Sequence, residues 1–314
     1  MLKFFLWRVL STVPVVFVVT FVVFGLILLI PGDPAITIAG PDATPEQIEV
    51  IRERLGLNRP FLIQYVDWLG SALQGDLGTS LFTSRAVTTS IMESLPVTLT
   101  LTLTAILISL LISVPLAIIS ATRRGGWIDR LATVTSSIGI ALPSFWLGLM
   151  LVLLFSLTLG WLPATGYVPL AQDPAAWLRH ILLPALTLGV AAAAESTRQL
   201  RGSIIEVLQQ DYVRTARAKG LRTRMVIGKH VLKNASVPLV TVIGLQVTLL
   251  LGGAIVVEQV FGIPGLGQVA ISAVTLRDIP VIQGVVLVAV LVAMLSNLLV
   301  DLAYGYLNPK VRAR

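Results

Sequence analysis

The chain has 314 residues, of which 55% are hydrophobic and only 12% are charged, and its mean hydropathy is +0.89. This composition excludes an ordinary soluble globular domain and indicates an integral membrane protein. The net charge of +7 does not indicate nucleic-acid binding, because the basic residues gather in short segments between apolar runs. The absence of cysteine excludes disulfides, thiol catalysis and thiolate metal sites.

The first apolar run, Val9–Ile30, follows Lys3 and Arg8 and so has the outline of a signal peptide. Its length argues against cleavage, because the apolar core of a signal peptide has about 7–15 residues. At about 1.5 Å per residue the run reaches roughly 33 Å, which is enough to cross the hydrocarbon layer. We therefore expect residues 1–30 to form a retained N-terminal transmembrane helix.

Residues 31–95 form a polar segment with eight acidic and four basic residues. Thr44-Pro45-Glu46-Gln47 has the form of a capping box, with Thr44 as N-cap, Pro45 at the first helical position and Gln47 reaching back. The apolar residues Ile48, Ile51 and Leu55 then share one face, and Gly56 suits the helix end. The sequence leaves open whether this helix lies on the rest of the protein or is part of a platform for an extracytoplasmic protein.

Five further uncharged runs follow, so we expect six transmembrane helices. The fourth helix has the shortest uncharged run, which also contains Pro184. Residues 195–198 would form its polar inner end, where Glu195 and Arg198 can pair. The remaining runs are Pro96–Thr122, Leu131–Leu159, Ile181–Ala194, Asn234–Val257 and Ile279–Leu302.

The basic residues between these runs predict the orientation. If the N-terminus is cytoplasmic, 17 of the 23 Lys and Arg residues fall in cytoplasmic segments and six fall outside. Basic residues are enriched in cytoplasmic loops. Both termini are therefore expected in the cytoplasm, with residues 308–314 as a C-terminal tail and residues 31–95 as an extracytoplasmic segment.

The largest inner segment, residues 198–233, holds nine basic residues against Glu206 and Asp211. Its part from Asp211 to Gly220 is compatible with a helix that ends at a glycine turn. A turn between two helices needs a residue that can adopt positive φ, which Gly220 supplies. We interpret this segment as a docking element for a partner; the alternative is a basic loop held against anionic lipid.

The sequence contains no catalytic or nucleotide-binding constellation. The only histidines, His180 and His230, fall on opposite sides of the membrane in the predicted topology. Gly228-Lys229 lacks the upstream glycine of a phosphate-binding loop. The stretch Gly262–Gly267 carries Pro264 and has no alternating strand-helix context, so it predicts a re-entrant turn or a tight external loop rather than a nucleotide site. Glu258 is expected at the outer end of the fifth helix, where water reaches it, so no buried proton relay is apparent. If ATP is consumed, another chain hydrolyses it.

Several short stretches carry a resemblance to a known family. Over its whole length the chain resembles the permease subunits of ABC-type importers, in the branch for dipeptides, oligopeptides, glutathione and nickel. The matching stretches are Pro31-Gly32-Asp33-Pro34, Gly75–Gly78 with Leu95–Leu99, Pro143–Gly148, Gly160–Pro163, Val257–Phe261 and Pro264–Gly267.

The inner segment is the most specific part of this resemblance. Importers generally have Glu-Ala-Ala, three residues, Gly, nine residues and Ile-x-Leu-Pro there. In this chain Arg214-Thr215-Ala216 precede Gly220 at that spacing, and His230–Lys233 lie at the far end. The glutamate, isoleucine and proline are replaced, whereas Ala216, Gly220 and Leu232 remain. The Ala-Arg-Ala-Lys-Gly sequence is the form that the peptide branch shows.

The resemblance implies an all-α type I importer transmembrane domain over residues 96–307, in which five core helices follow the outer N-terminal helix. It implies a bacterial or archaeal plasma membrane, a second homologous permease, two ABC ATPases and an extracytoplasmic substrate-binding protein. ATP and Mg would bind in the ATPases, with no cofactor in this chain.

The resemblance also implies two short coupling helices around Gly220 that would contact an ATPase. Ala216 would allow close approach to that partner, and basic side chains would pair with its acidic groups. The coupling residues would be Arg214, Thr215, Ala216, Arg217, Lys219, Gly220 and Leu232.

Two other classes of membrane protein would need features that this sequence does not show. A stand-alone secondary transporter would need an intramembrane carboxylate relay and an inverted repeat, and neither is visible in the sequence. An intramembrane enzyme would need paired catalytic groups at membrane depth, which are also missing. The sequence alone does not choose among a peptide, glutathione and nickel as substrate.

Overall fold

The structure is a computed structural model that describes residues 2–25, 34–39, 43–54 and 56–307. Within these residues the secondary structure is helical, apart from an isolated antiparallel bridge between Thr79 and Ala86. The helices are α1 Leu2–Gly25, α2 Pro34–Ala39, α3 Pro45–Arg54, α4 Phe61–Leu73, α5 Val87–Thr122, α6 Trp127–Ala141, α7 Ser144–Leu151, α8 Pro174–Leu208, α9 Asp211–Ala218, α10 Thr223–Met225, α11 Leu232–Phe261, α12 Leu266–Leu276 and α13 Ile279–Leu307, with π-helical segments η2 Val152–Thr158 and η3 Val226–Val231.

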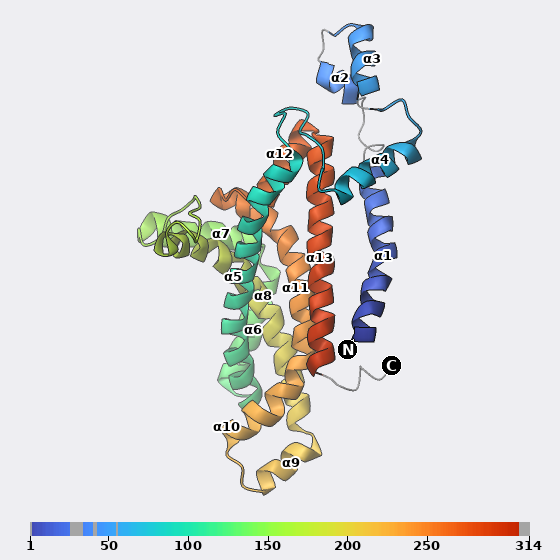
Figure 1. The fold of residues 1–314 in the computed structure, drawn as a ribbon. Coiled ribbons are helices and arrows are strands. Elements are labelled where there is room, and N and C mark those ends of the chain that lie inside the picture. The colour runs from blue at the N-terminus through green and yellow to red at the C-terminus, as the bar shows by residue number, and fades with distance from the viewer. Residues whose placement is uncertain (1, 26–33, 40–42, 55, 308–314) are drawn as a thin grey trace.

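Four long helices, α5, α8, α11 and α13, run along the molecule, and α1 lies beside α13 (Figure 1). Helices α2, α3 and α4 lie at one end, whereas α9 and α10 lie at the other (Figure 1). The described helices that are long and apolar enough to cross a membrane include Val87–Thr122, Pro174–Leu208, Thr223–Phe261 and Ile279–Ala303. The short uncharged run of the predicted fourth span is therefore part of one continuous helix, α8, and Pro184 does not interrupt it.

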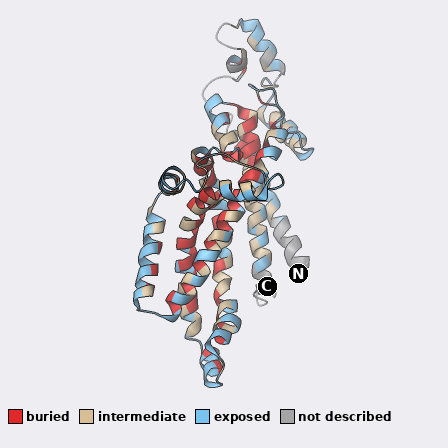
Figure 2. Cartoon of the chain, turned by 90° about the vertical axis from the view of Figure 1, so that its left-hand side faces the viewer, coloured by how far each residue is buried: buried red, intermediate tan, exposed pale blue. Residues whose placement is uncertain are grey.

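The core lies between α5, α8 and α11, where buried residues concentrate (Figure 2). Leu101, Ile181 and Phe261 are almost fully buried there. Small residues allow the helices to approach closely, as is common in membrane bundles. A Cβ atom on Gly189 of α8 would lie 2.8 Å from the carbonyl oxygen of Ala105 on α5. The outward face of α5 instead exposes Leu103, Leu107 and Leu111, as expected for a surface that faces lipid or another membrane subunit.

The expected third span, Leu131–Leu159, is not one straight helix. Helix α6 and the segment Ser144–Thr158 are bent by 104° relative to each other. Leu142 and Pro143 between them have extended backbones, with ψ of 129° and 133°. Proline removes a backbone donor and disfavours helix in the residue before it, which explains the break. Helix α7 consequently lies across the long axis of the bundle (Figure 1).

The N-terminal segment follows the sequence prediction in part. Helix α1 ends at Gly25, and the remainder of the predicted first span lies outside the described residues, as does most of the stretch Pro31–Pro34. The capping box on α3 is confirmed, because the Gln47 side chain accepts from the Thr44 N–H at 3.0 Å and Thr44 Oγ1 accepts from the Gln47 N–H at 3.4 Å. Gly56 has φ of +69°, in agreement with the predicted helix stop.

Candidate functional site

The coupling segment predicted from the sequence begins with helix α9 and a left-handed turn. Gly220 has φ of +77°, which confirms the expected positive φ. The Gly220 N–H donates to the Arg217 carbonyl at 2.9 Å, and the Leu221 N–H donates to the Ala216 carbonyl at 3.3 Å. These two bonds form a Schellman motif, which satisfies carbonyls at the end of a helix. The glycine therefore ends α9 and turns the chain back toward the bundle.

The second half of the coupling segment differs from the prediction of a separate short helix. Helix α10 has only three residues and continues without a break through η3 into α11. The stretch Thr223–Phe261 behaves as one long helical element. Only Leu221 and Arg222 separate the turn at Gly220 from this long helical element.

Helix α9 has a buried face that packs on the chain's own helices. Val213 is fully buried and Ala216 is 6% exposed, and Leu232 packs partly against the same residues. Ala216 therefore serves the packing of α9 on this chain, which corrects the expectation that it approaches the partner. We call this set the inner cluster; it comprises Ala117, Ala121, Leu200, Ile204, Val213, Ala216, Val226, Val231, Ala235 and Leu239.

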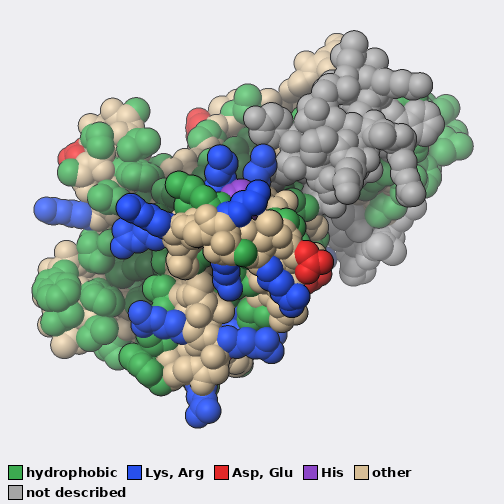
Figure 3. Space-filling view, turned by 90° about the horizontal axis from the view of Figure 1, so that it is seen from below, with side chains coloured by type: hydrophobic (Ala, Val, Ile, Leu, Met, Phe, Trp, Pro, Cys, Tyr) green, Lys and Arg blue, Asp and Glu red, His purple; other side chains and the backbone are tan. Residues whose placement is uncertain are grey.

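The opposite face of α9 is exposed and basic. Of the predicted coupling residues, Arg214, Thr215, Arg217 and Lys219 lie on it. Arg214 approaches Asp211 at 3.6 Å across one helical turn. Seen from this end, Lys and Arg side chains outnumber acidic ones over the visible surface (Figure 3). The buried face thus orients the helix, and the exposed face presents donors and positive charge.

An ion pair between a buried aspartate and a partly buried arginine joins three helices next to the inner cluster, and sequence reasoning missed it. Asp129 of α6 accepts from Arg201 of α8 at 2.6 Å to Nε and 2.8 Å to Nη2. Asp129 also accepts from the Gly125 N–H at 2.9 Å and from the Ser120 hydroxyl of α5. The one sequence feature that could have indicated this pair is Asp129, a single acidic residue in a turn that otherwise carries basic residues. By contrast, Glu195 and Arg198, which were expected to pair, are both exposed and form no ion pair within the described part of the chain.

At the other end of α11, the side chain of Glu258 is fully buried, which corrects the expectation that water reaches it. The Thr98 hydroxyl of α5 donates to Glu258 Oε1 at 2.6 Å, and the Gly267 N–H of α12 donates to Oε2 at 2.7 Å. The Leu266 N–H in turn donates to Thr98 Oγ1 at 2.8 Å. A Cβ atom on Gly267 would lie 2.5 Å from Ile255 Cα, so glycine is needed for this close approach. Glu258 thereby links α5, α11 and α12.

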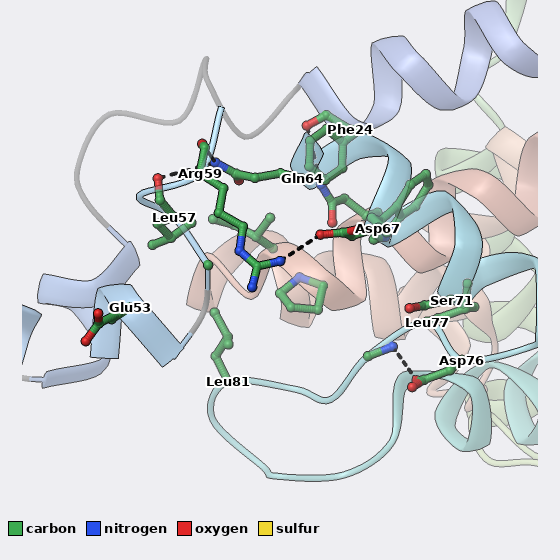
Figure 4. A pocket seen from close by; sticks show the side chains of 16 residues that line it. Phe24, Glu53, Leu57, Arg59, Gln64, Asp67, Ser71, Asp76, Leu77 and Leu81 are labelled. Carbon is green, nitrogen blue, oxygen red and sulfur yellow. Dashed lines mark hydrogen bonds and ion pairs between the residues drawn. The ribbon is translucent and has the colours of Figure 1, made fainter. Parts of the chain in front are cut away.

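A pocket of about 410 Å³ lies between α4, α13 and the loop that follows α4 (Figure 4). We call it the outer pocket. Arg59 extends across it and pairs with Asp67 at 2.9 Å, and Gln64 donates to the Arg59 carbonyl at 2.7 Å. Asp76 Oδ1 accepts from the Gly78 N–H at 2.8 Å at its edge. Within the described residues no group of three His, Cys, Asp or Glu side chains could hold a metal ion.

The chain matches known proteins over nearly its full length. Residues 113–313 match the family described as binding-protein-dependent transport system inner membrane component, and residues 1–102 match the family of the N-terminal part of such components. The glutathione transport system permease protein GsiC of Pectobacterium atrosepticum is 44% identical over 312 residues, which are 99% of both chains. A putative peptide transport system permease protein of Brucella abortus is 41% identical over 305 residues, or 97% of both chains.

Two solved structures share the fold at low sequence identity. The inward-facing methionine ABC transporter has a TM-score of 0.59 at 17% identity, over 70% of this chain and 96% of that chain. An amino acid ABC transporter has a TM-score of 0.53 at 18% identity, over 70% of this chain and 94% of that chain. The chain therefore belongs to the family of binding-protein-dependent transport system inner membrane components and is a multi-pass permease subunit of an ABC importer, with the type I fold.

Proposed function

We propose that this permease imports a small peptide-like substrate, such as a di- or oligopeptide or glutathione, that a substrate-binding protein delivers to residues 31–95. The observation that carries this proposal is the near-full-length identity of 41–44% to permeases named for peptide and glutathione transport. In this proposal the chain forms half of the translocation path, and a second homologous permease forms the other half. The exposed apolar face of α5, with Leu103, Leu107 and Leu111, is available to lipid or to that second subunit.

In the proposed complex, two ABC ATPases bind ATP and Mg, and this chain contributes no catalytic group. One ATPase receives the exposed face of α9, where Arg214, Arg217 and Lys219 meet acidic side chains. The buried face of α9, through Val213 and Ala216, fixes the helix to the inner cluster. Closure of the ATPases on ATP then moves α9 together with the bundle, as a rigid body rather than as a loose loop.

The geometry supports a continuous route for this movement. The element from Thr223 to Phe261 joins the coupling turn to the opposite end of the molecule without an interruption. There Glu258 ties α11 to α5 and α12 through its bonds with Thr98 and Gly267. A tilt of α11 at the coupling end would therefore displace α5 and α12 at the other end, which is the coordinated rocking that alternating access requires.

Reconstitution tests the proposed function directly. The permease is placed in lipid vesicles with its second permease, ATPases and binding protein, and uptake of labelled dipeptide, oligopeptide and glutathione is measured with and without ATP. We expect ATP-dependent uptake of at least one of these ligands. Uptake that needs no ATPase and follows an ion gradient would instead identify a secondary transporter.

The proposed orientation predicts that two exposed positions, one serine and one glutamine, are labelled from opposite sides of the membrane. The chain has no cysteine, so Ser71→Cys in the last turn of α4 and Gln210→Cys just before α9 introduce single thiols. Both positions are exposed. A membrane-impermeant maleimide should label Ser71→Cys in intact cells and should label Gln210→Cys only after the cells are opened. Labelling of both positions from outside would be incompatible with cytoplasmic termini and six spans.

Residues 31–95, the expected extracytoplasmic segment, are proposed as a platform for the binding protein. Deletion of residues 45–57, which removes α3, should reduce binding-protein-dependent uptake while the permease–ATPase complex still assembles. The matched control replaces the same residues with a Gly/Ser linker of equal length, which separates the loss of α3 from a shortened connection. Undiminished uptake by either variant would show that α3 is dispensable for delivery.

A further inference from the structure

Helix α4 presents three different faces. Tyr65 packs against Phe21 and Phe24 of α1, with ring centroids 5.2 and 5.8 Å apart, and thereby fixes α4 at the end of that transmembrane helix. A polar face carries Gln64, Asp67 and Ser71, which line the outer pocket (Figure 4). The remaining face is apolar.

The apolar face forms a stripe that no other described part of the chain covers. Leu62 and Val66 are both 64% exposed, and Leu73 is 81% exposed. Their positions, at i, i+4 and i+11, fall on one side of an α-helix. We call these three residues the α4 stripe. Leucine and valine side chains that are exposed together on one face of a helix point to an apolar environment in the assembled protein.

The stripe is continuous with surface that faces the membrane. Leu69 and Leu73 of α4 form one wall of an apolar groove of about 420 Å³ between α1 and α13. The other walls are side chains of α1 and α13, and all lining residues except Thr12 are apolar. These are Val13, Val16, Phe17, Leu291, Met294, Leu295 and Leu298. The groove therefore opens from the hydrocarbon layer onto the apolar side of α4, whereas the outer pocket lies on its polar side.

We propose that α4 is an interfacial helix whose stripe, Leu62, Val66 and Leu73, is immersed among lipid acyl chains at the membrane surface where α1 ends. A helix with one polar and one apolar face lies in the plane of the interface, with its polar side toward water. Tyr65 and Trp68 on the same helix are the residue types enriched at that depth. Acyl chains are the occupant, since α1 and α13, which flank the groove, themselves cross the hydrocarbon layer. This inference depends on α1 and α13 crossing the membrane. It does not depend on which substrate the importer carries.

Spin-label accessibility tests the proposal in the complete importer reconstituted in lipid vesicles. Single cysteines at Leu62, Val66 and Leu73 carry a nitroxide, and Ser71→Cys, which is exposed on the polar face of the same helix, is the matched control. Collision with oxygen should exceed collision with a water-soluble nickel chelate at the three stripe positions, and the order should reverse at Ser71. High nickel accessibility at the stripe would overturn the proposal. Exclusion of both reagents would overturn it too, because a protein partner would then cover the stripe.

A second measurement uses the unaltered chain, so that no substitution can disturb folding. A phospholipid with a photoreactive group on its acyl chain is activated in vesicles that contain the importer, and the adducts are mapped by mass spectrometry. We expect adducts at Leu62, Val66 or Leu73 of α4, as well as at the 57% exposed Leu295 of α13, which serves as the internal positive control. Adducts at Leu295 without any on α4 would overturn the proposal.

Discussion

Replacement of Asp129 by alanine is expected to destabilise the permease more than any exposed charge substitution. The side chain of Asp129 is 7% exposed and that of Arg201 is 28% exposed, so the substitution leaves a partly buried guanidinium without its partner. Removal of one partner of a buried ion pair costs about 3–5 kcal/mol. The measurement is the thermal unfolding midpoint of the purified permease, together with the yield of the complex with its ATPases.

The chain offers a matched control in the exposed pair Arg85–Glu93, whose side chains are 49% and 58% exposed. Glu93→Ala should cost about 1 kcal/mol or less, because exposed pairs contribute little. The double variant Asp129→Ala with Arg201→Met should be less impaired than the sum of the single variants, since it leaves no unpaired charge. Equal unfolding midpoints for Asp129→Ala and Glu93→Ala would contradict the role assigned to this ion pair.

Placement of a carboxylate in the inner cluster is expected to separate membrane insertion from coupling. Ala216→Asp or Val213→Asp buries an unpaired charge between α9 and the bundle, a loss of a few kcal/mol that detaches α9 from its packing. The spans should still insert, because the substitutions lie outside the hydrocarbon layer in the proposed topology. We expect the variants to reach the membrane, to retain little ATPase on purification and to show strongly reduced uptake.

Three further variants show whether this loss arises from the packing and the turn of α9. Gly220→Val forces an L-residue into the left-handed region, which costs about 1–2 kcal/mol or more, and it should disturb the turn after α9. Ala218→Asp makes the same chemical change as Ala216→Asp on the exposed side of α9, and it should leave the packing of α9 on the bundle intact. Arg217→Ala should be mild, because an exposed ion pair contributes about 1 kcal/mol or less. Wild-type ATPase retention and uptake for Ala216→Asp and Gly220→Val would exclude this segment as the coupling element.

The sequence predicted those features that depend on local composition. Uncharged runs located the long helices, the Thr44–Gln47 pattern located the start of α3, and Gly220 was expected at positive φ. The bend after α6 was not predicted, because an apolar run looks the same whether it crosses the membrane straight or turns at Pro143. Proline alone was no guide, since Pro184 lies within the continuous helix α8.

The features that the sequence could not predict depend on contacts between distant residues. Asp129 and Arg201 are 72 positions apart, and Thr98 and Glu258 are 160 positions apart. Without knowledge of these partners, Glu258 was indistinguishable from a carboxylate at a helix end in water. The direction of Ala216 was equally hidden, because alanine suits both a packed face and a close approach to a partner. Only the burial of Val213 and Ala216 on the same side of α9 decides between them.

Site-specific photo-crosslinking can show whether the exposed face of α9 contacts an ATPase. A photoreactive amino acid is introduced in place of Arg217 or Lys219, and in place of Ser71 as the control at the opposite end, and the importer is irradiated in native membranes. We expect adducts with the ATPase from positions 217 and 219 and none from position 71. Absence of ATPase adducts from both α9 positions, in a complex that still transports its substrate, would contradict this contact.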